Sequence, residues 1–339
     1  MQLKMSFHIE TRKVQQTGGS SYIISLPKEW IREHNVKKND TLGILSQPDG
    51  NLLVTPYSTS QEYVKKKEFT VKDNMDSDYL FRLLIGAYIM GYSIIIVQTT
   101  SDKFERKIKE TIKGFIRITI GPEIIEESAN RIFIKDLLNP KEYPFEKAIR
   151  RMYILAQEMH EDAVNAFETG NKNLAKKVIE RDDELDKLNW LVERQSHIVL
   201  RDIILCQKMN ITLEDASNFQ LMGKFLERIG DHAVKIAENV LKIDYDKIGK
   251  SLFEEITKAS KISLELLNIS LDSWLQKNLE LANENIESIN NLIEFCQQIQ
   301  FNRENAHDFA VEVGYVIESI RRTGEYAGDI SEIIINNLI

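Results

Sequence analysis

The sequence contains little cysteine, proline or glycine. Its 339 residues include two cysteines, six prolines and 15 glycines. Cys206 and Cys296 have no CxxC or Cys/His spacing, which argues against a disulfide framework or a zinc ribbon and fits a reducing compartment. Because proline and glycine interrupt regular structure, their scarcity favours long regular elements, above all helices.

The sequence also lacks a convincing membrane-spanning run. The first residues contain no apolar core of a signal peptide, so we expect none. Residues 80–97 are largely apolar, but Arg82 and two glycines interrupt them. We interpret this stretch as an amphipathic helix over residues 76–90 followed by a buried strand over residues 93–97. We therefore expect a soluble, cytoplasmic protein that is not an integral membrane protein.

Charge is distributed unevenly along the chain, which has a net charge of −8. Residues 1–70 contain ten basic and seven acidic side chains, whereas the remaining residues contain 34 basic and 45 acidic ones. This difference suggests that a polyanion would meet the N-terminal segment and a cation the remainder. The composition, with 42% hydrophobic and 28% charged residues, is that of a globular protein, and the length suggests two or three domains.

Residues 1–57 have the pattern of a small β-rich domain. Short strands are predicted over residues 7–11, 22–26, 41–46 and 52–55. A short helix is predicted from Pro27 to Glu33, with Pro27 at its first position. So short a segment has little sequence for a core of its own, so we expect it to dimerise.

The run RKVQQTGGSSYIISLPKEW at residues 12–30, followed by Val36–Asp40, resembles the AbrB/MazE-type swapped-hairpin domain. It is most similar to the form found at the front of archaeal PhoU-like regulators. The resemblance implies a homodimer that binds DNA through its first hairpin and neighbouring loops.

Six residues of this segment are DNA-binding candidates. Basic side chains neutralise phosphates, and amide and hydroxyl groups donate to the DNA backbone or to base edges. The candidates are Arg12, Lys13, Gln15, Ser20, Ser21 and Lys28. The alternative is a dimerisation module whose charges only maintain solubility, and the interleaved acids Glu10 and Glu29 favour that alternative.

Residues 58–143 alternate strand and helix patterns and predict a small α+β spacer domain. Strands are expected over residues 68–71, 93–98, 117–120 and 131–136, and helices over residues 76–90 and 101–115. Ser101 and Asp102 are the expected N-caps of the second helix. No glycine-rich phosphate loop is present, so this segment is interpreted as a spacer or a ligand-sensing module.

Residues 144–339 show apolar residues at three- and four-residue spacing, the pattern of packed amphipathic helices. Breaks are expected near residues 169–171, 209–210, 244–249, 276–278 and 301–305, which gives three helices in each half. The halves also echo each other, since residues 229–238 correspond to 323–332 and residues 182–188 to 283–289. We therefore divide the segment into two repeats, residues 144–248 and 249–339.

Both echoes resemble PhoU proteins, in which two three-helix repeats form a six-helix bundle. The fold class is therefore multi-domain and mainly α. In PhoU proteins an E(D)xxxD motif on two helices of each repeat holds iron or zinc, and the first repeat here keeps both copies, Asp182…Asp186 and Glu227…Asp231. A four-residue spacing places both carboxylates of a copy on one helix face.

Carboxylate oxygens suit hard cations such as Mg²⁺. The expected cofactor is therefore one multivalent metal ion, whether iron, zinc or magnesium, bound by Asp182, Asp186, Glu227 and Asp231. The alternative is that these acids form an ordinary solvated helix face. We expect His232 to be a structural hydrogen-bonding residue and not a ligand.

The second repeat departs from the motif. Asn283…Glu287 keeps one acid of two, and Arg321…Glu325 has a cation at the first position. Arg321 is expected to pair with Glu325 or Glu318 and to supply the positive charge internally. A metal site is therefore expected in the first repeat alone.

Catalysis is not expected. A di-iron carboxylate site needs Glu-x-x-His on two helices, and the chain offers one such spacing, Glu304 to His307. The resemblances imply a regulator of phosphate homeostasis that binds DNA, with partners such as a phosphate transporter or a signalling kinase. The alternatives are an adaptor that docks on the transporter without DNA contact, and a metal-dependent enzyme.

Overall fold

The structure is a computed structural model, and it describes residues 9–47, 50–56, 65–72, 74–245, 250–299 and 309–339. The chain divides into two compact units, residues 1–63 and residues 64–339. Each unit is described by itself.

The first unit consists of two antiparallel hairpins and a short helix. Strands β1 (Gln15–Thr17) and β2 (Ser21–Ile23) form the first hairpin, and β3 (Gly43–Ser46) and β4 (Leu52–Thr55) form the second. Helix α1 (Lys28–Glu33) lies between them in the sequence. Gly18 and Gly19 have φ values of 57° and 74°, the left-handed conformation that the tight turn after β1 requires.

Several predictions for this unit need correction. Residues 9–11 form no strand, while residues 7–8 lie outside the described residues. The first strand of the unit is instead Gln15–Thr17, which the sequence did not predict because it has no apolar alternation. Pro27 precedes the helix as its N-cap and does not occupy the first helical position.

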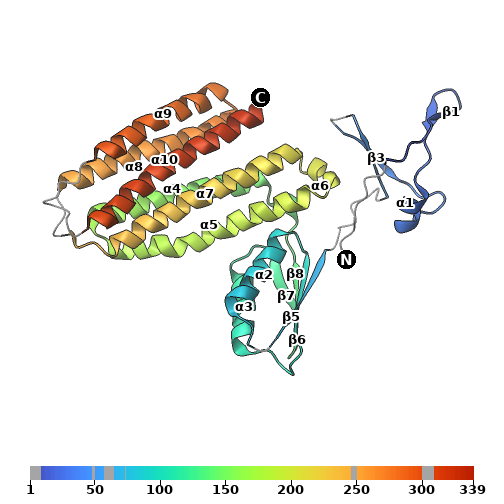
Figure 1. Cartoon of the computed structure of the whole chain (residues 1–339), viewed down its shortest axis with the longest axis horizontal. Helices are drawn as coiled ribbons and strands as arrows, with labels where there is room; N and C mark the ends of the chain where they lie inside the picture. The colour runs from blue at the N-terminus through green and yellow to red at the C-terminus, as the bar shows by residue number, and fades with distance from the viewer. Residues whose placement is uncertain (1–8, 48–49, 57–64, 73, 246–249, 300–308) are drawn as a thin grey trace. The chain divides into compact units, whose positions relative to one another are not determined.

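The first part of the second unit is a four-stranded sheet with two helices on one face (Figure 1). The sheet has the order β5-β6-β8-β7, in which β5 and β6 are parallel and the other pairs antiparallel. The elements are β5 (Lys66–Val71), α2 (Ser77–Ile89), β6 (Ile94–Thr99), α3 (Arg106–Arg117), β7 (Pro122–Glu127) and β8 (Arg131–Asp136).

This part follows the predicted α+β pattern with two differences. Helix α3 begins at Arg106, and neither Ser101 nor Asp102 caps it, because the preceding loop is held by the Phe104 N–H donating to the Ala129 carbonyl at 2.9 Å. The strand predicted over residues 117–120 is absent, because α3 continues to Arg117. The strand lies later, at Pro122–Glu127 on the sheet edge, where a proline is tolerated.

The second part of this unit is a bundle of six long helices (Figure 1). The first repeat contains α4 (Phe145–Thr169), α5 (Lys172–Val199) and α7 (Leu213–Val240), with a short α6 (Ile203–Lys208) that the sequence did not predict. The second contains α8 (Lys250–Gln276), α9 (Leu279–Gln298) and α10 (Ala310–Leu338). The predicted breaks at residues 169–171 and 276–278 are confirmed. The break at residues 301–305 lies outside the described residues, as does part of the one at residues 244–249.

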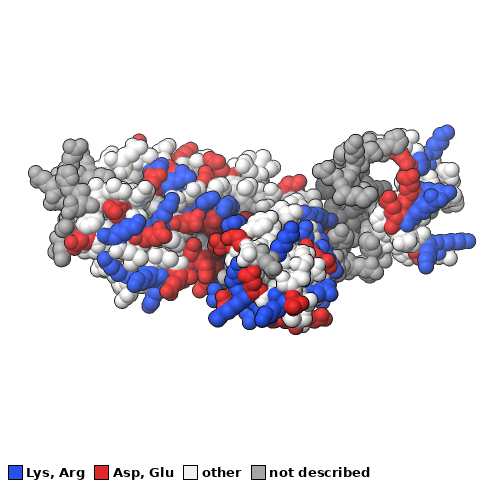
Figure 2. All heavy atoms as spheres, turned by 60° about the horizontal axis from the view of Figure 1, so that its bottom comes forward, with Lys and Arg blue, Asp and Glu red and all other residues white. Residues whose placement is uncertain are grey.

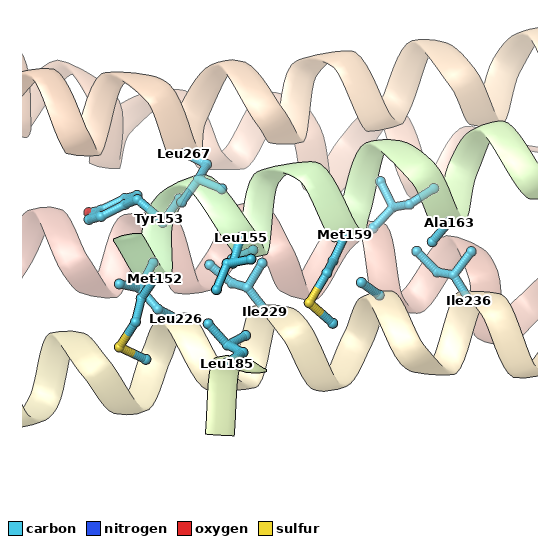
Figure 3. Close-up of a cluster of buried hydrophobic side chains, with 14 of the residues drawn as sticks. Met152, Tyr153, Leu155, Met159, Ala163, Leu185, Leu226, Ile229, Ile236 and Leu267 are labelled. Carbon is cyan, nitrogen blue, oxygen red and sulfur yellow. The ribbon is translucent and has the colours of Figure 1, made fainter. Parts of the chain in front are cut away.

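The two repeats pack side by side through α7 against α10 and α4 against α8. Apolar side chains of these helices form one continuous core, part of which is shown in Figure 3. A polar contact also crosses this interface between α4 and α8: the Tyr153 hydroxyl lies 3.1 Å from the Ser270 hydroxyl. No described helix is long and apolar enough to cross a membrane.

The sheet and the bundle are joined at α5. Trp190 of α5 packs against the core between the sheet and its helices. The side chain of Arg194 is 3% exposed and contacts Asp136 at the end of β8. The α+β part is therefore attached to the first repeat by buried contacts.

Candidate functional site

The candidate site lies between α5 and α7, which pack closely along one another. Gly230 of α7 permits this approach, because a Cβ atom there would lie 2.2 Å from Leu185 Cδ2. Leu185 meets Leu226 and Ile229 in the core (Figure 3). Burial of these apolar residues determines which face of each helix points to solvent. The acidic residues are their neighbours in the sequence, so the same packing also sets the direction of the acidic side chains.

The structure places the two acidic pairs of the sequence on the neighbouring helices α5 and α7, with Asp182 Oδ1 3.7 Å from the Cβ position of Gly230. Burial, followed by the charges of Asp231 and Glu227, raises the pKa of Asp182 to about 6. Burial, followed by Asp182, Glu227 and Asp231, raises the pKa of Asp186 to about 7. Each shift arises because a carboxylate that is partly removed from water faces other negative charges. All four predicted ligands therefore belong to one acidic cluster, defined as Asp182, Asp186, Glu227 and Asp231.

Neighbouring cations satisfy part of this acidic cluster. Lys224 Nζ lies 2.8 Å from Glu227 Oε2, and Arg228 Nη1 donates to Asp231 Oδ2 at 3.0 Å. On the α5 side, Asp182 Oδ1 is buried and has no hydrogen-bond partner among the described residues. Figure 2 shows acidic and basic side chains interspersed over the bundle. Glu227 and Asp231 on α7 thus have neighbouring cations, but Glu227 Oε2, like Asp182 Oδ1, is buried without a hydrogen-bond partner among the described residues.

The acidic cluster fits a hard cation in its chemistry. Its oxygen donors are the ligand type that Mg²⁺, Ca²⁺ and oxidised iron prefer, and the buried Asp182 Oδ1 is free to accept a ligand bond. No group of three or more His, Cys, Asp or Glu side chains within the described residues is arranged as a metal site. Binding would therefore require the carboxylates to rotate toward one another.

The second repeat has replaced this arrangement by ion pairs. Arg321 Nη2 lies 2.6 Å from Glu318 Oε1, and Arg321 Nη1 also pairs with Glu325. Asn283 Nδ2 donates to Glu287 Oε1 at 3.0 Å. The expectation that Arg321 pairs within its own helix is confirmed, for both acids. Arg321 stands where the first repeat has Glu227, so a cation replaces one acid of the motif.

His232 follows Asp231 in the sequence but faces the neighbouring repeat. Its ring centroid lies 5.8 Å from that of Tyr326 on α10. Burial, and next the charge of Lys235, lower the pKa of His232 to about 4. Its Nδ1 is buried and has no hydrogen-bond partner among the described residues, so the hydrogen-bonding role expected for His232 is not observed and its contact is with the Tyr326 ring.

The DNA-binding candidates are all exposed in the first unit. Gln15 lies on β1, Ser21 on β2 and Ser20 in the turn between them, so the first hairpin gathers three of the six candidates. Arg12 and Lys13 immediately precede β1, and Lys28 begins α1. Arg12 pairs with Glu10, which neutralises part of its charge.

Sequence reasoning did not single out Arg194, which joins the sheet to the bundle. Its guanidinium donates to Asp136 and to the carbonyl oxygens of Tyr88 and Tyr92. These partners lie 58 to 106 residues away in the sequence, so no local pattern identifies them. The available signal was the position of an arginine beside the buried residues Leu191, Val192 and Gln195.

Comparison with known families agrees with both parts of this architecture. Residues 149–240 match the PhoU domain, and residues 15–62 match the family described as "Antidote-toxin recognition MazE, bacterial antitoxin". The PhoU match spans α4 to α7 and includes all four acidic residues.

Individual proteins are similar to part of the chain. The chain is 29% identical over 137 residues to the "Phosphate-specific transport system accessory protein PhoU homolog 1" of Thermotoga maritima, covering 40% of this chain and 56% of that relative. It is 31% identical over 150 residues to the PhoU homolog of Aquifex aeolicus, covering 44% and 66%. The chain therefore spans less than two thirds of these relatives.

The fold is that of a solved PhoU protein. The crystal structure of PhoU from Pseudomonas aeruginosa matches with a TM-score of 0.51 and 18% identity, over 58% of this chain and 96% of that one. Two three-helix repeats, with acidic residues facing each other across α5 and α7, thus define a PhoU-type bundle. The chain therefore contains a PhoU domain at residues 149–240 and a MazE-like segment at residues 15–62.

Proposed function

We propose that this chain regulates phosphate uptake, with the bundle as an accessory component of a phosphate transport system and the first unit as a DNA-binding element. The PhoU match over residues 149–240 carries the first half of this proposal. The named relatives are accessory proteins of phosphate-specific transport systems, and the role proposed for this chain is regulatory.

The exposed first hairpin supports DNA binding. Arg12, Lys13 and Lys28 are solvent-exposed, so their charges are available to phosphates. The left-handed Gly18 and Gly19 have no atoms near their Cα hydrogens, so the turn is open for close approach of a backbone phosphate. Neutralising phosphates with lysine and arginine releases counterions, which gives such binding a steep dependence on salt.

A second copy of the chain is proposed to complete the first unit. None of its described residues is buried. Apolar side chains that would form a core are open to solvent, with Tyr22 71%, Ile44 67% and Leu52 65% exposed. A unit of this size gains too little by burying apolar surface alone. A homodimer, formed through these side chains, would supply the missing contacts.

The transport half is tested by phosphate uptake in the cells that produce this chain. Deletion of the gene is expected to leave phosphate uptake high when phosphate is abundant, because the chain is proposed to restrain the transporter under that condition. Re-expression of the full chain should restore low uptake. Uptake that is unchanged by deletion at both high and low phosphate contradicts this half of the proposal.

The DNA half is tested by fluorescence anisotropy with promoter DNA of the phosphate-transport genes. Binding at low salt should weaken steeply as salt rises, and Arg12→Ala, Lys13→Ala and Lys28→Ala should each weaken it. Lys176→Ala, an exposed lysine of the bundle, is the matched control and should bind as the parent does. Absence of binding at low salt to every such promoter contradicts the DNA role.

The alternative is an adaptor in which the first unit only dimerises. The ion pair between Arg12 and Glu10 favours it, because that arginine is partly neutralised. In this case gene deletion changes phosphate uptake while the purified chain binds no promoter DNA. The two experiments together therefore separate the regulator from the adaptor.

A metal ion in the acidic cluster is a second candidate function. The buried, unpartnered Asp182 Oδ1 favours it, and the candidates are iron, zinc and magnesium. Elemental analysis of the purified chain should find one ion per chain, and Asp182→Asn/Asp186→Asn should lose it. Glu184→Gln, an exposed acid of the same helix, is the control. Equal metal content in all three proteins contradicts the site.

A further inference from the structure

A second charged site lies where the sheet joins the bundle, at the carboxyl end of α2. Lys65 Nζ and Arg201 Nη1 both donate to the carbonyl oxygen of Met90, at 3.0 and 2.9 Å. Two cationic nitrogens that share one oxygen at these distances are less than about 6 Å apart in any arrangement. Lys65 immediately precedes β5, whereas Arg201 follows α5. The two side chains therefore come from segments that are distant in the sequence.

His197 of α5 belongs to the same group. Burial, followed by the charges of Arg201 and Lys65, lowers its pKa. Burial, followed by Arg201, Arg194 and Lys67, also lowers the pKa of Lys65. Apart from burial, the groups that shift the pKa values of Lys65 and His197 are all basic residues, and none is acidic. Lys65, His197 and Arg201 are called the junction cluster from here on.

The junction cluster has more positive charge than its surroundings balance. The carboxyl end of a helix such as α2 carries only about half a negative charge. Asp136, at the same junction of sheet and bundle, is paired with Arg194 in a buried contact at 2.5 Å. Within the described residues neither Lys65 nor Arg201 forms an ion pair with a carboxylate, nor does His197. The structure thus holds these cations together without an acid to offset their repulsion.

The local backbone is built to make this convergence. Gly91 ends α2 with a φ of 74°, and a Cβ atom there would lie 2.8 Å from Ile198 Cγ1. Its absence lets the turn after α2 lie directly against α5 beside His197. Lys65 is further positioned over the ring of Tyr92, with Nζ 4.0 Å from the ring centroid. Elements far apart in the sequence therefore position the Lys65 and Arg201 side chains on one carbonyl oxygen.

We propose that the junction cluster binds a doubly charged oxyanion of the phosphate class. The Lys65 ammonium and the Arg201 guanidinium supply the charged donors that such a group accepts, and the neutral His197 imidazole supplies one further N–H donor. The anion would bridge the α+β part and the bundle, because its donors come from both. This proposal does not rest on DNA binding or on transport, since its evidence is confined to this junction.

Isothermal titration of the intact chain with inorganic phosphate tests the proposal. The parent is expected to bind phosphate at low-millimolar concentration or below. Lys65→Gln and Arg201→Gln should each lower the affinity by about tenfold or more, as expected for the loss of a charge-assisted donor. The control Lys176→Gln should bind as the parent does. A phosphomonoester in place of phosphate distinguishes a free anion from the phosphoryl group of a larger ligand.

A second readout protects the test against misfolded variants. The His197 ring signal, assigned by comparison with His197→Gln, should shift when phosphate is added to the parent, whereas signals of the other histidines should not. No heat of binding and no shift of His197 in the parent would overturn the proposal. Equal affinity in the parent and both charge variants would overturn it as well.

Discussion

Arg194 and Asp136 form a buried ion pair between the helical bundle and the sheet, with Arg194 Nη2 donating to Asp136 Oδ2 at 2.5 Å. Their side chains are 3% and 9% exposed. The second oxygen of Asp136, Oδ1, accepts from the Leu138 N–H at 3.0 Å. The guanidinium also lies over the Tyr88 ring, 4.8 Å from its centroid. This contact explains how the sheet and the first repeat form one unit.

Replacing Arg194 alone should destabilise the protein strongly. Arg194→Met leaves Asp136 as a buried, unpaired charge, which costs about 3–5 kcal/mol of unfolding free energy. Urea unfolding followed by circular dichroism measures the change. The double variant Arg194→Met/Asp136→Leu should be less destabilised than the single one, because no charge is left unpaired. A single variant with the parent's unfolding midpoint would show that the pair is not buried.

Gly230→Ala tests the close approach of α5 and α7. The added methyl group would lie 2.2 Å from Leu185 Cδ2, so the helices must separate or Leu185 must leave its rotamer, at about 1–3 kcal/mol. Gly314→Ala on α10 is the control, because nothing lies within 4 Å of its Cβ position. That variant should be neutral or slightly stabilised, since alanine favours helix. Differential scanning calorimetry compares the two, and equal melting temperatures would contradict the packing described.

Asp186 should make the metal-free protein less stable as pH rises. The folded protein keeps this proton up to a pH of about 7, whereas an unfolded aspartate loses it near about 4. The group's stabilising effect is therefore complete below that lower value and is lost progressively up to the higher one. Asp186→Asn, measured with chelator at neutral pH, should melt higher than the parent. Glu184→Gln is the control, and a lower melting temperature for Asp186→Asn would contradict the repulsion.

His160 should act in the opposite direction. It is fully buried between α4, α8 and α10, with Nε2 3.0 Å from Ser260 Oγ and Nδ1 3.2 Å from Thr323 Oγ1. Burial, and next the charge of His232, lower its pKa from 6.5 to about 4. Unfolding releases an imidazole that takes up a proton, so stability is complete above the unfolded value and falls as pH drops below it.

The size of this effect is at most about 3 kcal/mol at acidic pH, from the difference between the two pKa values. Urea unfolding of the parent and of His160→Asn over this pH range measures it, and the variant should lose the share of the acid sensitivity that His160 contributes, while His232, whose pKa is also lowered to about 4, keeps its own. His34→Asn, on an exposed histidine of the first unit, is the control. Parallel profiles for the parent and His160→Asn would contradict the assignment. Asp186 lowers the stability as pH rises, whereas His160 lowers it as pH falls. Each residue's contribution to the pH dependence is therefore measured by comparing the parent with the variant of that residue.

The sequence predicted the bundle well because the long helices have apolar residues at three- and four-residue spacing. Leu185, Leu226 and Ile229 are buried where the three- and four-residue pattern places them. The same periodicity placed the two acidic pairs on facing helices, where burial and the neighbouring carboxylates raise the pKa values of Asp182 and Asp186. Arg321 was also predictable, because its partners Glu318 and Glu325 lie within one helical turn.

Other features were not predictable because they depend on contacts distant in the sequence. The junction cluster joins Lys65 to Arg201 through the Met90 carbonyl, and no local pattern relates these residues. The start of α3 was predicted too early, because a backbone hydrogen bond from Phe104 to Ala129 holds the preceding loop. In each case tertiary contacts prevailed over local sequence signals.

Mapping of chromosomal DNA bound by the chain, in cells grown with abundant and with scarce phosphate, tests the central claim most directly. The account predicts enrichment at phosphate-transport promoters that changes with phosphate supply and is lost in Arg12→Ala/Lys13→Ala. Lys176→Ala should keep the parent's pattern. Enrichment at no promoter in either condition, or enrichment that the double variant retains, would contradict a phosphate regulator that acts through its first hairpin.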